Sequence, residues 1–151
     1  MKLAFEETIR APQRVVWELI TDLHGAPARI SSIVALEVLT HGPVGRGTRF
    51  RETRVMFGRK ATEELEVTQF DAPHTYTVEA DSCGVRFVST YTLRESGGTT
   101  VLRLDIRTAP RTLFAKLMAP LGALFAGAMR KEIARDNAEL RQAAEARAGH
   151  G

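Results

Sequence analysis

The chain has 151 residues, which suits a single domain with a substantial hydrophobic core and leaves no room for a second domain. Charged residues make up 26% of the chain and hydrophobic residues 44%, proportions that are typical of compact globular proteins. The formal net charge is +3, but the basic residues alternate with acidic ones and form no basic stripe, which argues against nucleic acid as a partner.

The cysteine and histidine positions argue against a disulfide and a metal site. Cys83 is the single cysteine, so no intrachain disulfide can form. The histidines fall in predicted loops or near the C-terminus without metal-ligand spacing, so neither a metal nor a cofactor is expected: His24, His41, His74 and His150. The N-terminal sequence MKLAFEETIR carries acidic residues where a signal peptide needs an apolar core, so a cytoplasmic protein is expected.

The N-terminal part of the chain predicts a strand followed by two helices. Apolar residues alternate from Leu3 to Ile9, which is the period of a strand. Pro12 stands at a first-turn position of a helix in APQRVVWELITDL, where its missing N–H does no harm. A break at HGAP then precedes a short second helix.

The middle of the chain has the period of two that indicates β-strands. Each connection is short and rich in Gly, Pro, Asp or Ser, so neighbouring strands should pair as antiparallel hairpins in a meander. Six strands are predicted: Val34 to Leu39, Thr48 to Met56, Lys60 to Phe70, Thr75 to Ala80, Val85 to Leu93 and Thr100 to Thr108.

A helical period returns at Arg111 and predicts a helix of about 25 residues, roughly 38 Å long. Its first part, TLFAKLMAPLGALFAGAM, holds Lys116 as its single charge, but the Pro and Gly residues inside it argue against a membrane span. Pro120 predicts a break, with Arg111 to Ala119 set at an angle to the part that begins near Leu121. Beyond Met129 the helix becomes amphipathic, with Ile133 and Leu140 facing inward, and is expected to act as a clamp. This order of elements predicts an α+β fold.

Three stretches of the sequence carry a resemblance to a known family: APQRVVWELITD, GPVGRGTRFRE and PRTLFAKLMAPLGALFAGAMRKEI. With the order of elements, they resemble the START-like, helix-grip (SRPBCC) superfamily, and within it the group of polyketide cyclases/dehydrases and lipid transport proteins. Many relatives carry a Trp shortly after the second helix, where this chain reads ARISSIVAL. The resemblance implies a curved seven-stranded antiparallel sheet that grips the C-terminal helix, with a cavity between them. Residues 1–146 are expected to form this single domain and residues 147–151 a flexible tail.

The period of two also predicts which strand residues face that cavity. If Phe57 lies opposite Lys60 in the hairpin, Arg54 faces Glu63 and Glu52 faces Leu65, all on the inward side. This charged group is either the polar end of an apolar pocket or an exposed cross-strand pair. The predicted ligand contacts of the sheet are Phe50, Glu52, Arg54, Glu63, Leu65, Tyr76, Val78, Phe87, Ser89, Tyr91 and Leu104.

The apolar start of the C-terminal helix is expected to serve as a wall and lid of the cavity. Alternatively, its outer face docks onto a membrane or a second subunit, since exposed apolar surface usually marks a contact. The oligomeric state stays open. The ligand contacts predicted in this segment are Leu117, Met118, Leu121, Leu124 and Phe125.

Two classes of function follow from such a cavity. The first is a binding or carrier protein for a hydrophobic small molecule such as a lipid, isoprenoid, quinone or polyketide. The second is a cyclase or aromatase that shapes a polyketide-like chain while a side chain assists proton transfer. Candidates for that catalytic role are Glu63, Arg54 and Tyr91.

Overall fold

The computed structural model describes residues 1–122 and 126–149, which form one antiparallel sheet with helices on its concave side. The sheet has seven strands in the order β1-β7-β6-β5-β4-β3-β2. The α+β helix-grip fold predicted from the sequence is confirmed. In chain order the elements are β1 (Lys2–Ile9), α1 (Gln13–Thr21), α2 (Ala26–Arg29), β2 (Ile33–Val38), β3 (Arg49–Met56), β4 (Arg59–Asp71), β5 (Thr75–Ser82), β6 (Val85–Ser96), β7 (Thr99–Pro110), α3 (Leu113–Gly122) and α4 (Ala126–Arg147).

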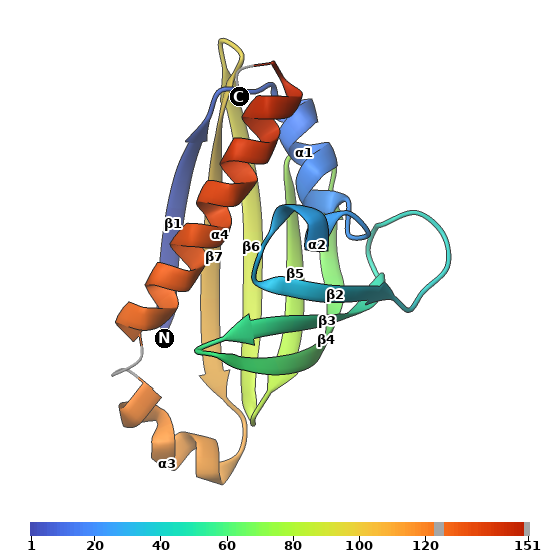
Figure 1. Ribbon diagram of the computed structural model, residues 1–151. Coiled ribbons are helices and arrows are strands. Elements are labelled where there is room, and N and C mark those ends of the chain that lie inside the picture. The colour runs from blue at the N-terminus through green and yellow to red at the C-terminus, as the bar shows by residue number, and fades with distance from the viewer. Residues whose placement is uncertain (123–125, 150–151) are drawn as a thin grey trace.

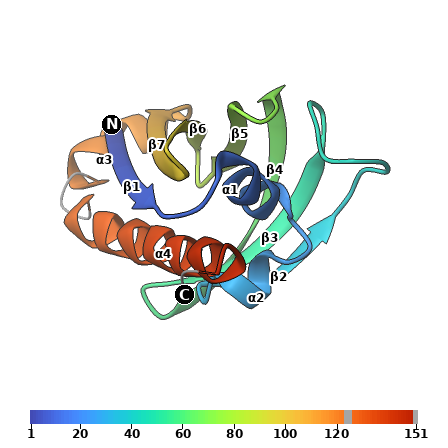
Figure 2. The same ribbon diagram turned by 90° about the horizontal axis from the view of Figure 1, so that it is seen from above.

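The sheet curves around helix α4. Figure 2 shows α4 inside the curve, with the strands running around it from β1 through β5 to β2. Helices α1 and α2 cover the same concave side near one end, and α3 lies beyond the opposite end of β7 (Figure 1). The helices therefore cover only part of the concave face, which leaves space for a cavity between the helices and the sheet.

The main core lies where α1 packs on the sheet. Trp17 of α1 is 5.3 Å from Phe70 and 5.7 Å from Tyr76, measured between ring centroids. From the far end of α4, Leu140 and Ala144 belong to the same cluster. Such close aromatic and aliphatic packing fixes α1 and the second half of α4 to the sheet.

The β3–β4 hairpin corrects the predicted register. Met56 pairs with Arg59, so the turn is the two-residue Phe57-Gly58, and both turn residues have positive φ (51° and 74°). Glu52 consequently lies opposite Glu63, and the predicted partners are wrong by two residues. A left-handed Phe is uncommon in such a turn, where Asn or Asp is usual, which explains the error. Because a shift of two residues keeps every side chain on its face, the inward set is unchanged.

The C-terminal helices also differ from expectation in one respect. Two helices occur, as predicted, and their axes meet at 82°, but Pro120 lies inside α3, which continues to Gly122. A proline removes only one helical hydrogen bond, that to the carbonyl of Lys116, and both residues are exposed so that water can satisfy it. Helix α4 extends to Arg147, and residues 150–151 of the predicted tail lie outside the described part of the chain.

Candidate functional site

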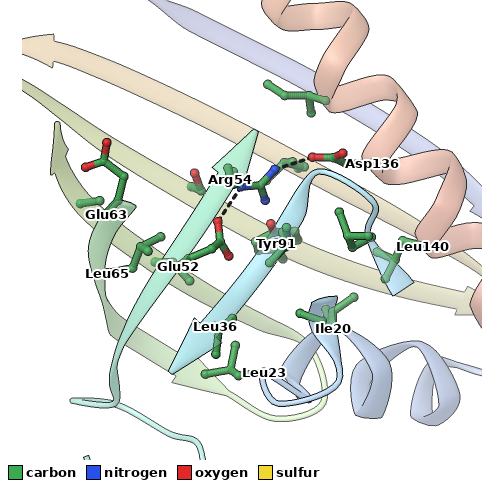
Figure 3. A pocket seen from close by; sticks show the side chains of 18 of the residues that line it. Ile20, Leu23, Leu36, Glu52, Arg54, Glu63, Leu65, Tyr91, Asp136 and Leu140 are labelled. Atoms are coloured by element: carbon green, nitrogen blue, oxygen red, sulfur yellow. Dashed lines mark hydrogen bonds and ion pairs between the residues drawn. The ribbon is translucent and has the colours of Figure 1, made fainter. Parts of the chain in front are cut away.

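A cavity of about 340 Å³ lies between the concave face of the sheet and the helices α1, α2 and α4. Most of its lining is apolar: Ile20 and Leu23 from α1 and the adjoining loop, Leu36 from β2 and Leu140 from α4 surround one part of it (Figure 3). The volume falls in the range of sites that hold small organic ligands.

All of the sheet residues predicted to face the cavity do line it. They lie on five adjacent strands, and every second residue of each strand points inward, as pleating requires. Their role in binding a ligand stays a prediction. The residues are Phe50, Glu52, Arg54, Glu63, Leu65, Tyr76, Val78, Phe87, Ser89, Tyr91 and Leu104.

The predicted wall and lid need correction for their described residues. Leu117, Met118 and Leu121 do not line the cavity, and 71%, 40% and 47% of their respective surfaces are exposed. Helix α3 lies beyond the end of β7 at 82° to α4 (Figure 1), and none of its residues lines the cavity. Leu124 and Phe125, also predicted contacts, lie outside the described residues.

Arg54 forms the centre of a polar cluster on the cavity wall. Its Nε donates to Oε1 of Glu52 at 2.5 Å, and its Nη1 donates to Oδ2 of Asp136 at 2.6 Å and to Oγ of Ser32 at 3.1 Å. Ser32 in turn donates to Oδ1 of Asp136 at 2.9 Å. The guanidinium thus ties β3 to α4 across the cavity (Figure 3).

The charge on Arg54 is stabilised by its partners. Burial lowers the pKa of Arg54, but the carboxylates of Glu52 and Asp136 outweigh burial and hold the pKa above its usual value. Among the described residues, Nη2 of Arg54 has no hydrogen-bond partner. This group is therefore a free donor beside the cavity.

Glu63 does not join Arg54 as predicted. Its Oε1 accepts a hydrogen bond of 2.6 Å from Oγ of Ser82, the last residue of β5. The residues that line the cavity include four carboxylates, those of Asp22, Glu52, Glu63 and Asp136, and two guanidiniums, those of Arg29 and Arg54, with Arg29 paired to Asp22 at 3.0 Å. The predicted polar end of an apolar pocket is present, with a different set of pairs.

Tyr76 and Tyr91 stack side by side on β5 and β6, with ring centroids 4.9 Å apart and an angle of 9° between the rings. The hydroxyl of Tyr76 donates to the carbonyl of Ile20 at 2.9 Å. No hydrogen bond within the described part of the chain involves the hydroxyl of Tyr91, a residue that lines the cavity. It can donate to or accept from a bound molecule.

The acidities of the two tyrosines reflect this environment. Burial raises the pKa of Tyr91 to about 12, although the charge of Arg54 acts in the opposite direction. Burial, together with the neighbouring Tyr91, also raises the pKa of Tyr76 well above its usual value. Both hydroxyls therefore keep their protons at neutral pH.

Because the chain has only these two tyrosines, titration of the wild-type protein tests both pKa shifts directly. We expect little tyrosinate absorbance at 295 nm at pH 10, with Tyr91 ionising near pH 12 and Tyr76 also well above its usual pKa. Folding raises the pKa values of both tyrosines. Their contribution to the stability of the fold is therefore fully present below pH 10 and is lost as the pH rises toward 12. Half of the absorbance change near pH 10, with the fold intact by circular dichroism, would contradict the raised pKa of one of the two tyrosines.

Sequence reasoning missed the contribution of α4 to the cavity. Asp136 and the buried Asn137 line it together with Met129, Ile133 and Leu140. The signal was present, because Asp136 and Asn137 interrupt the apolar spacing from Ile133 to Leu140. Helix α4 is therefore part of the cavity wall as well as a clamp.

The residues described give no sign of a metal centre. Over residues 1–122 and 126–149, no group of three His, Cys, Asp or Glu side chains is arranged to hold a metal ion. Ser89 lies on the cavity wall, but no histidine stands among the residues that line it. A nucleophilic triad cannot be assembled from these residues.

Comparisons with known proteins agree with this architecture. A family model described as "Polyketide cyclase / dehydrase and lipid transport" matches residues 2–145. Three similar structures are TTHA0849 of Thermus thermophilus (21% identity, 97% of this chain and 98% of the other, TM-score 0.76), the aromatase/cyclase ZhuI of Streptomyces sp. R1128 (17%, 97% and 94%, 0.79) and a START superfamily protein of Mycobacterium smegmatis (14%, 95% and 97%, 0.76). These identities support a shared fold. No curated protein matches the chain.

Proposed function

Because the chain belongs to the polyketide cyclase / dehydrase and lipid transport family, we propose that its cavity binds a hydrophobic small molecule with an uncharged polar end. The observation that carries this proposal is a mainly apolar cavity of about 340 Å³ whose wall holds the polar cluster around Arg54 and, apart from it, the Asp22–Arg29 ion pair. The apolar lining favours a lipid, isoprenoid, quinone or polyketide-like body. The cluster offers hydrogen bonds to one end of such a molecule.

The charges in the wall favour a hydroxyl or carbonyl group over a carboxylate. Arg54 already has two carboxylate partners, Glu52 and Asp136. With Glu63 and the Asp22–Arg29 pair, the residues that line the cavity include four carboxylates and two guanidiniums, so negative charge is in excess. A ligand carboxylate would bring a further negative charge, which is unfavourable at low dielectric. The Nη2 donor of Arg54 and the hydroxyl of Tyr91 suit a neutral oxygen instead.

Displacement of the neutral fluorescent probe N-phenyl-1-naphthylamine tests this proposal. We expect dodecanol to displace the bound probe, and dodecanoate at neutral pH to bind about tenfold more weakly because of charge repulsion. Tyr91→Phe should weaken dodecanol binding several-fold, since one hydrogen bond is lost, without changing thermal stability.

The outcomes separate two parts of the proposal. If neither the probe nor dodecanol binds, and organic extraction of the purified protein yields no co-purified lipid, the binding function is wrong. If dodecanoate binds as well as dodecanol, the cavity binds hydrophobic molecules but the preference for an uncharged end is wrong. Glu52→Gln is the matched variant, because one fewer negative charge should strengthen dodecanoate binding and leave dodecanol unaffected.

A cyclase-type enzyme that uses the same cavity is the second candidate. It is favoured by the protonated Tyr91 hydroxyl and the free Arg54 donor, which could polarise a carbonyl, and by the Glu63 carboxylate on the same wall, which could accept a proton. Glu63→Gln separates the two functions. It should abolish conversion of a polyketide-like substrate if the protein is an enzyme, and leave ligand uptake intact if it is a carrier.

A further inference from the structure

Helix α3 exposes an unusual amount of apolar surface. Leu113, Phe114 and Leu117 are exposed by 75%, 72% and 71%, and Met118 and Leu121 by 40% and 47%. The helix projects beyond the end of the sheet (Figure 1), and Ala115 is its buried residue. Contiguous exposed apolar side chains on this scale mark a contact surface.

The position of α3 is fixed by its first turn. The carbonyl of Gly84, in the β5–β6 turn, accepts a hydrogen bond of 2.7 Å from the amide of Arg111. Oγ1 of Thr112 caps the helix by accepting a 3.1 Å bond from the amide of Ala115. The apolar side chains are thus presented by an anchored helix.

The same end of the molecule is strongly basic. From Arg107 to Lys131 the sequence contains five basic residues and no acidic one, and Lys2 lies opposite Arg107 in the sheet. Most other arginines of the protein pair with carboxylates, whereas among the described residues none of these cations forms a salt bridge. The basic end comprises Lys2, Arg107, Arg111, Lys116, Arg130 and Lys131, all exposed.

This combination selects one kind of partner. A second copy of the chain meeting through α3 would bring two basic ends together, which is electrostatically unfavourable. An anionic bilayer accommodates both features, because apolar side chains enter the acyl region while lysine and arginine contact the headgroups. Since the whole chain carries only +3, the rest of the molecule is net acidic, which orients the basic end toward such a surface.

We propose that α3 docks in the plane of an anionic lipid bilayer, with Leu113, Phe114 and Leu117 inserted and the basic end against the headgroups. Docking in the plane fits the helices better than crossing. No single helix in the described ranges is long and apolar enough to span, and only the bent pair α3 and α4 meets that test by length and composition. Helix α4 is held on the sheet through the buried Leu140 and Ala144, so it is not free to insert. The proposal is independent of what the cavity binds.

Vesicle flotation with the full chain tests the proposal. We expect binding to vesicles of phosphatidylcholine mixed with phosphatidylglycerol, little binding to phosphatidylcholine alone, and weakening by added salt. The double variant Phe114→Ser/Leu117→Ser should bind at least about tenfold more weakly, since it loses inserted apolar area. Each of Arg111→Gln and Lys116→Gln should lower the affinity about fivefold.

Two matched controls distinguish this surface from any exposed hydrophobe or cation. Phe57→Ser removes an aromatic side chain that is 56% exposed on the β3–β4 turn, and Arg94→Gln removes an exposed cation near the β6–β7 turn. Both should bind anionic vesicles as the wild type does. The proposal is overturned if the wild type ignores anionic vesicles, if the α3 variants bind normally, or if Phe114→Ser/Leu117→Ser instead abolishes a dimer seen by analytical ultracentrifugation.

Discussion

Replacing Arg54 with Met is expected to lower the free energy of unfolding by about 2–3 kcal/mol. The substitution keeps much of the side-chain volume but leaves the carboxylates of Glu52 and Asp136, which are 12% and 14% exposed, without their cation. Removing one partner of a buried ion pair costs about 3–5 kcal/mol, and the 32% exposure of Arg54 reduces that cost. Urea denaturation followed by the fluorescence of Trp17, the single tryptophan, measures the change.

Arg86→Met provides the matched control. Arg86 is exposed to nearly the same extent, 31%, and also bridges two carboxylates, but its partners Glu79 and Asp81 are 24% and 57% exposed. This change should cost less than about 1 kcal/mol, as for surface ion pairs. The triple variant Arg54→Met/Glu52→Gln/Asp136→Asn should recover stability relative to Arg54→Met. Equal losses at Arg54 and Arg86, or no recovery, would show that the cluster is solvated and weak.

Replacing Ser89 with Phe is expected to reduce binding of the neutral probe by more than about tenfold. Ser89 lies on the cavity wall between Val78 of β5 and Ile106 of β7, so the new ring enters the space that a ligand would occupy. Phenylalanine suits a strand, and the cavity offers room, so the fold should be preserved. The measurements are a probe titration and a thermal unfolding curve on the same sample.

Val88→Phe is the control for this substitution. Val88 is the neighbouring residue of β6, and the pleat directs it to the convex face of the sheet. Its replacement should leave probe binding unchanged. Normal binding by Ser89→Phe would mean that the probe binds elsewhere, and would remove the support for a ligand in this cavity.

The strands and their faces were predictable from the sequence because each depends on local information. Alternation from Val85 to Leu93 assigned Phe87, Ser89 and Tyr91 to one face, and the pleat of a strand allows no other arrangement. The inward placement of Arg54 survived an error in the hairpin register for the same reason.

Three features of the site depended on contacts between distant segments. Asp136 reaches Arg54 across 82 residues of sequence, and Glu63 is bound by Ser82 from the next strand. The exposure of Leu117 follows from the direction in which α3 leaves β7. The sequence pattern shows that a helix has an apolar face. It does not show whether that face packs against the rest of the protein or is exposed on the surface.

The sequence by itself thus determined the order of elements, the seven-stranded sheet and the side of each strand that faces inward, because backbone geometry repeats every two or 3.6 residues. The tertiary structure decided which charges meet, that α4 forms a wall of the cavity and that α3 does not. These outcomes depend on how far the sheet curves and at what angle each helix crosses it, and both are set by packing among residues far apart in the chain.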